Sequence, residues 1–255
     1  MVLNIVMLGS GNVATHLSAA LINSGHKIIQ VYSRKFKNAK ELAEKCNAIP
    51  INKVSKLDND SDLYIIAISD KAIGELVSTI DFTNKNVVHT AGSVSLNIFP
   101  KSIVQYGVFY PFQTFSKKRD VQFSDIPICI EANTAKFEEF LISIASQLSG
   151  NVQKINSTQR KHIHLTGVFA CNFVNHLYYI ACNILSKNNI DEKILNPLIR
   201  ETSAKINELS PFEAQTGPAV RNDKESIKKH LDLLSSSPEY QQIYSLLSDD
   251  IYKTH

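Results

Sequence analysis

The stretch "MLGSGNVATHLSAAL" at residues 7–21 decides the fold of this chain. It ends an apolar run at residues 3–8 and opens an amphipathic run at residues 12–24, whose apolar side chains recur at helical spacing. The turn Gly9-Ser10-Gly11 stands between the two runs. The pattern therefore predicts a strand, a tight glycine turn and a helix that stops at Gly25.

Strand and helix signals keep alternating after this first unit. Further strands are predicted at residues 27–33, 62–69 and 86–92, and a second helix at residues 38–46. The strand runs are apolar throughout, as expected for strands buried on both faces of a parallel sheet. The first part of the chain is therefore predicted to be α/β: a Rossmann-type, mostly parallel sheet with helices on both faces.

The last hundred residues carry a different pattern, because strand signals end at about residue 156. Residues 157–187 form one long helical pattern with a broad apolar face, of the kind that is often buried between subunits. Pro197 is expected to kink or split the next helix, and two more helices follow. We therefore expect two domains, a Rossmann domain at residues 1–153 and an all-α domain at residues 154–255.

Composition and charge narrow the functional classes. Hydrophobic residues make up 44% of the 255 residues, and the net charge of +3 is too small to indicate a nucleic-acid partner. The four cysteines are far apart and form no C-x-x-C pair, so neither a metal site nor a disulfide framework is expected. The first apolar run is too short to span a membrane and no basic segment precedes it. We expect a soluble, cytoplasmic protein without membrane attachment.

The glycine turn has the form of a phosphate-binding loop. Gly9 would permit the tight turn, Gly11 would let the backbone approach a pyrophosphate, and Ala14 stands where a third small residue packs helix against strand. Backbone N–H groups at the start of the helix, at Asn12 and Val13, would then point at the phosphates. The alternative is a turn that binds nothing, but the strand before it and the helix after it favour dinucleotide binding.

The end of the second strand indicates which dinucleotide. An NAD site usually has an acidic residue there, whereas this chain has Ser33, Arg34 and Lys35. A hydroxyl and two cations suit the 2′-phosphate of a ribose, so NADP(H) is the predicted cofactor. The alternative is a solvated basic loop.

Two later strand ends complete the predicted cofactor site. Ile68, Ser69 and Asp70 follow the strand at 62–69, and Ala91 follows the strand at 86–92 within "HTAGS". Ser69 and Asp70 would either touch the ribose and nicotinamide or cap the next helix, and capping is the commoner role for an aspartate there. The segment around Ala91 suits either close approach of the nicotinamide ring or a simple loop. The predicted cofactor-binding residues are Gly9, Gly11, Asn12, Val13, Ser33, Arg34, Lys35, Ile68, Ser69, Asp70 and Ala91.

Several motifs together resemble a known family. The N-terminal motifs "IVMLGSGNVATHL", "VYSRK" and "DLYIIAISDKAI" are similar to those of the superfamily of pyrroline-5-carboxylate reductase and 6-phosphogluconate dehydrogenase. "GVFYPFQTFS", "RKHIHLTGVFACNFVNHLY" and "TGPAVRNDKESIKKHL" resemble, more narrowly, a bacterial family of NADP oxidoreductases with a C-terminal domain of unknown function. The resemblance covers nearly the whole chain and implies a Rossmann domain followed by a helical dimerisation domain.

Two positions depart from the patterns that the resemblance implies. The motif H-P-x-Q-T-F of the family has Tyr110 in place of its histidine here. The catalytic lysine of related β-hydroxyacid dehydrogenases, in the pattern G-x-x-x-K, is replaced by Cys171. The second departure argues against a β-hydroxyacid dehydrogenase.

Three residues are candidates for the chemistry. His164 matches a histidine of the family and would donate a proton, although a buried histidine bonded to a backbone carbonyl is the alternative. Asn172 is eight residues further along the same predicted helix and would orient the substrate, unless it only joins two helices. Arg221, beside a helix start that Asn222 or Asp223 would cap, would meet a substrate carboxylate or phosphate, unless it is a surface arginine.

These expectations combine into one functional hypothesis and an alternative. The hypothesis is an NADP-dependent oxidoreductase that transfers hydride to or from a small carbonyl or imine substrate bound between the two domains, in a homodimer formed by the C-terminal helices. The alternative, supported by the absent lysine and by Tyr110, is a non-catalytic NADP(H)-binding sensor or scaffold protein.

Overall fold

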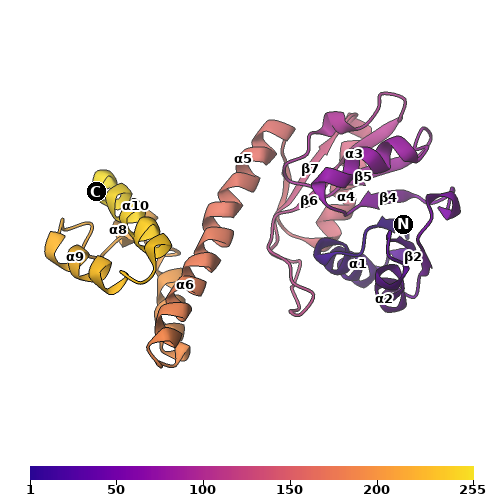
Figure 1. Ribbon diagram of the computed structural model, residues 1–255. Coiled ribbons are helices and arrows are strands. Elements are labelled where there is room, and N and C mark those ends of the chain that lie inside the picture. The colour runs from indigo at the N-terminus through magenta and orange to yellow at the C-terminus, as the bar shows by residue number, and fades with distance from the viewer. The chain divides into compact units, whose positions relative to one another are not determined.

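The computed structural model describes residues 1–255 and contains one eight-stranded sheet (Figure 1). The strands lie in the order β3-β2-β1-β4-β5-β6-β7-β8. Their bounds are β1 Asn4–Leu8, β2 Lys27–Tyr32, β3 Ile49–Ile51, β4 Leu63–Ile66, β5 Asn86–His89, β6 Gln105–Pro111, β7 Ile128–Ala132 and β8 Val152–Lys154. The helices of this part are α1 Asn12–Asn23, α2 Phe36–Cys46, α3 Asp70–Thr79 and α4 Ala135–Leu148.

The first six strands run parallel to one another, and only the β6–β7 pair is antiparallel. The chain builds outward from β1 through β2 to β3 and then returns to place β4 on the other side of β1. This return creates a topological switch point between β1 and β4, which is where doubly wound sheets bind their ligands. The predicted Rossmann-type fold is confirmed.

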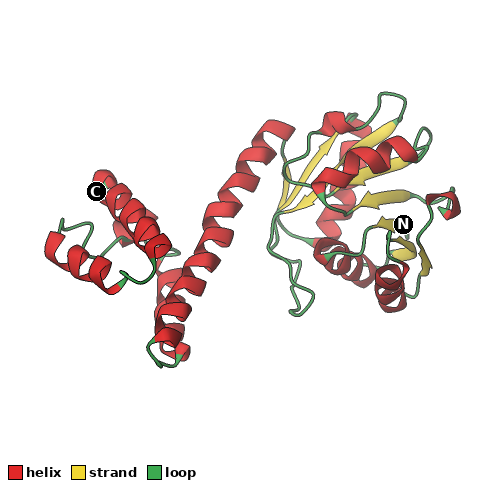
Figure 2. Cartoon of the chain, in the orientation of Figure 1, coloured by secondary structure: helices red, strands yellow, loops and turns green.

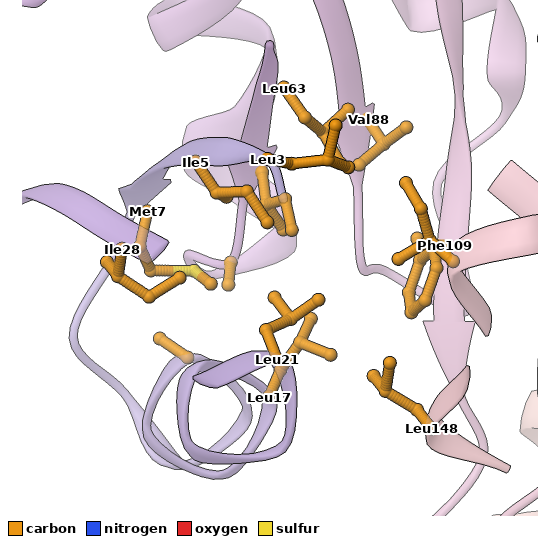
Figure 3. Packing of buried hydrophobic residues seen from close by; sticks show 14 of the residues in the cluster. Leu3, Ile5, Met7, Leu17, Leu21, Ile28, Leu63, Val88, Phe109 and Leu148 are labelled. Carbon is orange, nitrogen blue, oxygen red and sulfur yellow. The ribbon is translucent and has the colours of Figure 1, made fainter. Parts of the chain in front are cut away.

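Helices cover both faces of the sheet, as the apolar strands require. One face carries α1, α2 and α4, whose buried side chains pack with strand residues such as Ile5 and Met7. Figure 3 shows Leu17 and Leu21 of α1 pointing toward that face. The other face packs Val6 and other strand residues against α3 and the segment that follows β5. The two cores hold the strand ends in fixed positions, and the candidate site depends on those ends.

The C-terminal part consists of helices only (Figure 2). A helical run at Ser157–Lys187 comprises α5 Ser157–Gly167, a π-helical segment Val168–Phe173 and α6 Val174–Lys187. The remaining helices are α7 Asn196–Lys205, α8 Pro211–Ala214, α9 Lys224–Leu233 and α10 Pro238–Thr254. Pro197 lies in the first turn of α7, behind a short 3₁₀ segment, so it splits the predicted helix.

Contacts divide the chain into two compact units, Met1–Asn172 and Phe173–His255. The first unit includes α5, whose buried Arg160 forms an ion pair with Glu131 of β7. The predicted functional division at residues 153 and 154 stays a prediction. The second unit buries few apolar side chains of its own, among them Ile180 and Ala219.

The run Ser157–Lys187 is the one helical segment that is long and apolar enough to cross a membrane by length and composition. A single helix of this kind is weak evidence for a membrane span. Its first turn is polar and docks on the sheet, through the buried side chain of Arg160.

Candidate functional site

A cleft of about 1050 Å³ opens at the carboxyl ends of the parallel strands, within the first unit. This volume is at the upper end of the range for pockets that hold cofactors and other small molecules. Every predicted cofactor-binding residue lines the cleft. These residues are Gly9, Gly11, Asn12, Val13, Ser33, Arg34, Lys35, Ile68, Ser69, Asp70 and Ala91.

Gly9 follows β1 and lies against the end of β4, at the switch point between these two strands. Its φ of +141° is rarely adopted by residues with a side chain, and its N–H donates to the carbonyl of Tyr32 at 2.9 Å. A Cβ at this position would lie 2.1 Å from the carbonyl oxygen of Ala67. Gly9 is therefore required by the protein itself, because the turn after β1 presses against the end of β4.

Gly11 is a glycine for a different reason. A Cβ there would meet no protein atom within 4 Å, and the φ of −78° suits any residue. Gly11 is the N-cap of α1, no side chain caps the helix, and its first turn holds no acidic residue. The uncapped N–H groups and the open space beside Gly11 fit a pyrophosphate group of a dinucleotide.

Asn12 also holds a loop in position. Its side-chain amide donates to the carbonyl of Phe115 at 2.8 Å, and the His16 ring lies 2.9 Å from the carbonyl of Ser116 while stacking on Phe115. These bonds fix the loop between β6 and β7 beside the glycine turn. Because the side chain of Asn12 is used in this way, its predicted contact with the cofactor concerns its backbone N–H and stays a prediction.

Cations gather where β2 and β3 end. Arg34 and Lys35 are exposed and neither forms an ion pair with a carboxylate. The Ser33 N–H donates to the carbonyl of Ile51 at 3.1 Å, so the segment after β3 runs alongside and adds Lys53 to the cleft. Lys53 was not among the predicted cofactor-binding residues. A basic residue directly after a strand that pairs with β2 was the available signal, but the pairing itself could not be known.

Another region of the cleft contains a tyrosine and a histidine in contact. The Tyr110 hydroxyl, from β6, lies 3.1 Å from Nδ1 of His164, from α5. A Cβ at Gly92 would lie 2.6 Å from that nitrogen and 2.8 Å from Cζ of Tyr110. The absence of a side chain at Gly92 thus allows both rings to pack on the segment that follows β5.

His164 is exposed at the cleft and bonds to a hydroxyl. The alternative of a buried histidine bonded to a backbone carbonyl is therefore wrong. Burial raises the pKa of Tyr110 to about 12, with a further rise from the nearby Cys129 and Asp70. The phenol consequently keeps its proton throughout the physiological range.

The expected capping role of Asp70 is wrong. Ser69 occupies the N-cap position of α3, and no side chain caps this helix. Asp70 is the first residue of the helix, and its carboxylate accepts a hydrogen bond from the hydroxyl of Ser93. This bond ties α3 to the segment that holds Gly92.

Asn172 and Arg221 do not line the cleft. Asn172 is exposed within the π-helical segment, so the eight residues that separate it from His164 do not form regular α-helical turns and do not place both side chains on one side of the helix as predicted. Arg221 is exposed and belongs to the second unit, beside Asp223, which caps α9 as expected by accepting from the N–H of Ser226 at 3.0 Å. Their roles in catalysis stay predictions.

Comparison with known proteins identifies the family. Residues 4–92 match the family described as "NADP oxidoreductase coenzyme F420-dependent", and residues 126–251 match a "Domain of unknown function (DUF2520)". A "putative NADP oxidoreductase" from Bacteroides fragilis is 44% identical in sequence and has a TM-score of 0.95, with 99% of this chain and 98% of that chain covered. The chain belongs to this family of NADP oxidoreductases.

More distant structures share the fold. A reductive aminase from Aspergillus terreus, solved with NADPH and ethyl levulinate, is 12% identical with a TM-score of 0.74, over 99% of this chain and 95% of that one. A pyrroline-5-carboxylate reductase from Streptococcus pyogenes is 12% identical with a TM-score of 0.64, over 99% of both chains. No curated protein matches the sequence. The predicted family, enzyme class and NADP(H) cofactor are confirmed, while the substrate is not identified.

Proposed function

We propose that this NADP oxidoreductase transfers hydride between the nicotinamide and a small carbonyl or imine substrate held beside Tyr110 and His164. The observation that carries the proposal is that this pair lines the same cleft as the glycine turn. Bound NADPH would supply the hydride, so the chain needs to position the substrate and to provide a proton.

The Tyr110–His164 pair is suited to supplying that proton. Reduction of a carbonyl or imine leaves a basic oxygen or nitrogen, which a hydroxyl donor can protonate. Tyr110 holds its proton up to about pH 12, and Nδ1 of His164 lies within hydrogen-bond distance of the same hydroxyl. The phenol can therefore donate to the substrate while the imidazole stabilises the phenolate that forms.

Kinetics with single variants test this assignment. Wild type, Tyr110→Phe, His164→Asn and the control His162→Asn would be assayed for NADPH oxidation across a panel of aldehydes, ketones, keto acids and cyclic imines. His162 lies on the same helix, bonds to the carbonyl of Thr158 and does not line the cleft. General-acid catalysis is worth about 10²–10⁴-fold, so the first two variants should lose about 100-fold in kcat with unchanged NADPH affinity, and the control should match wild type.

Two outcomes would count against the proposal. Full activity of both Tyr110→Phe and His164→Asn would remove the pair from the chemistry. Tight NADPH binding with no turnover on any compound of the panel would favour the sensor or scaffold alternative instead.

We further propose that the second unit forms a homodimer through its helices. This unit leaves large apolar side chains exposed, including Ile194 at 67%, Leu198 at 62%, Leu233 at 81% and Leu246 at 71%. A helical unit that buries so little apolar surface of its own lacks the core that a stable fold needs. A second copy of the chain would supply a matching apolar surface, whereas α7, α9 and α10 carry several charged side chains that do not suit a membrane.

Analytical ultracentrifugation and a dilution series of thermal melts test the dimer. We expect a dimer at micromolar concentration, a melting temperature that rises with protein concentration, and a monomeric or unfolded form for Leu198→Glu. Lys101→Glu, which reverses an exposed charge in the first unit, is the control. A monodisperse monomer with a concentration-independent melting temperature would refute the dimer.

A further inference from the structure

One stripe of residues on α5 faces the sheet. Ser157, Arg160, His164 and Gly167 follow each other at intervals of three, four and three residues, so they lie on one side of the helix. Each makes a contact with the rest of the first unit, whereas the residues between them are mostly exposed. The last of the four, Gly167, leaves room for Phe112: a Cβ there would lie 2.8 Å from its ring. The helix therefore docks along a defined line.

Arg160 is the deepest anchor on this line. Its side chain is fully buried and forms an ion pair with Glu131 of β7. The same guanidinium donates to the carbonyl of Val94 at 2.5 Å and to the hydroxyl of Ser157 at 3.2 Å. One planar group thus links α5, β7 and the segment that follows β5.

Ser157 completes the cluster at the start of α5. Its hydroxyl lies 2.9 Å from a carboxylate oxygen of Glu131 and also accepts from the N–H of Leu96 at 2.9 Å. The acidic side chain is 15% exposed, so the pair is shielded from water. Nε of Arg160 has no hydrogen-bond partner and is buried, which adds to the cost of holding this charge inside.

Burying the Arg160–Glu131 pair costs desolvation free energy, so a contribution to stability does not explain why the pair is present. A buried ion pair contributes little net stability compared with apolar side chains of similar volume, because both charges lose their hydration. The pair instead fixes the position of His164 relative to Gly92 in the candidate site. Val94, bonded to Arg160, is two residues from Gly92, and Gly92 is the position against which the His164 ring packs. Arg160 and His164 are one helical turn apart.

We propose that Arg160 is a positioning residue that holds His164 against Gly92 and in hydrogen-bond reach of Tyr110. The catalytic consequence rests on the proposed function, whereas the positioning itself does not. The clearance at Gly92 is so small that a shift of α5 by one ångström separates the two rings or forces them into the backbone. The guanidinium fork is required, because Glu131 and Val94 are bonded by two different nitrogens of that group, whereas the ammonium group of a lysine has a single nitrogen that cannot lie at both positions.

The test uses two variants of the full chain that we expect to fold, one that keeps the charge at position 160 and one that removes both charges of the pair. Arg160→Lys retains the charge and loses the fork. The double variant Arg160→Met with Glu131→Leu replaces the pair by apolar side chains, an exchange that often preserves or raises stability. Lys161→Met, next on the helix and exposed, is the control. Cooperative thermal unfolding identifies the variants that fold.

The first readout follows the His164 ring and needs no substrate. Nitrogen NMR of the imidazoles, with the His164 signals assigned by their loss in His164→Asn, should show shifted or broadened His164 resonances in the Arg160 variants and unchanged ones in Lys161→Met. NADPH titration should give affinities within about twofold of wild type, because Arg160 does not line the cleft. Wild-type His164 resonances in both Arg160 variants would overturn the proposal.

The second readout separates positioning from the proposed chemistry. With an active substrate from the panel, we expect kcat to fall by at least tenfold in Arg160→Lys and in the double variant, with a smaller effect on KM. Recovery of full activity by Arg160→Lys would show that charge alone suffices and would overturn the role of the fork. Moved His164 resonances together with full activity in His164→Asn would leave the positioning intact and refute the proposed function.

Discussion

Replacing Gly11 by alanine should strongly weaken cofactor binding and leave the fold intact. The added Cβ meets no protein atom within 4 Å, and the backbone angles of Gly11 are allowed for alanine. A glycine-to-alanine exchange at a compatible position restricts the unfolded chain, so the free energy of unfolding without cofactor should stay unchanged or rise by about 0.4–1 kcal/mol. The protein should express and melt like wild type.

The same Cβ would occupy the space through which the proposed pyrophosphate reaches the start of α1. Hydrogen bonds to a charged group are worth about 1.5–3 kcal/mol each, so losing two N–H contacts costs about 3–6 kcal/mol. At 1.4 kcal/mol for each tenfold, the dissociation constant for NADPH should rise by about 10²–10⁴-fold. Isothermal titration with NADPH measures this change, and thermal melts with and without NADPH measure it independently.

Gly9→Ala makes the same exchange two residues earlier but should destabilise the fold, unlike Gly11→Ala. Its Cβ would lie 2.1 Å from the carbonyl oxygen of Ala67, in a backbone conformation with φ of +141°. Overpacking and backbone strain each cost about 1–3 kcal/mol, so this variant should be destabilised before any cofactor is added. Wild-type NADPH affinity in Gly11→Ala, or a wild-type melting temperature in Gly9→Ala, would contradict the roles assigned to the two glycines.

Three further predictions follow from the cleft and from the buried histidine. Arg34→Ala should weaken NADPH binding by about tenfold or more and leave NADH binding within twofold, by fluorescence titration, since a charged hydrogen bond is worth about 1.5–3 kcal/mol; equal losses for both cofactors would contradict a 2′-phosphate contact. Lys53→Met should show the same selectivity more weakly, whereas Lys56→Met, which does not line the cleft, should have no effect. Burial, and then the charge of Arg160, lowers the pKa of His89 to about 3, so its stabilising contribution is complete above pH 6.5 and declines as the pH falls toward 3. Between pH 6.5 and 5 this should remove about 2 kcal/mol from the free energy of unfolding, and urea titrations of wild type and His89→Gln should show a shallower loss in the variant.

The N-terminal fold was predictable because its signals are local. Gly9 and Gly11 stand between a strand and a helix, and Ser33, Arg34 and Lys35 stand directly after the next strand. In a parallel sheet, all such strand ends meet along one edge, so the spacing of these residues along the chain sufficed to place them in one cleft. No pairing between distant residues had to be known.

The part of the cleft that contains Tyr110 and His164 depends on contacts between distant residues, and the spacing of residues along the sequence does not reveal such contacts. Tyr110 and His164 are 54 residues apart and meet because β6 and the second half of α5 both border the cleft. Gly92 is needed as a glycine only because those two rings pack on it. Lys53 enters the cleft through the pairing of β2 with β3. Each of these requires the three-dimensional arrangement.

Helical spacing was unreliable for Asn172 because one segment of the helix departs from α geometry. Positions eight residues apart have a definite angular relation only if every turn between them holds the same number of residues. The π-helical segment Val168–Phe173 breaks that condition, and nothing in the sequence indicates it. Arg221 lies in the second unit, so its relation to His164 depends on how units and copies assemble.

The sequence resemblance implies a histidine where this chain has Tyr110, and this difference leads to a last prediction. A phenol with a pKa of about 12 remains a donor at every physiological pH, whereas a histidine has an ordinary pKa of about 6.5 and loses its cationic form near neutrality. Tyr110→His should therefore add a pH dependence to that of wild type. From pH 6 to 8 the protonated fraction of an ordinary histidine falls about 25-fold, and kcat for NADPH oxidation by the variant, relative to that of wild type, should fall by a similar factor. A pH profile of Tyr110→His parallel to that of wild type would mean that residue 110 does not carry the proton, even though its hydroxyl contacts His164.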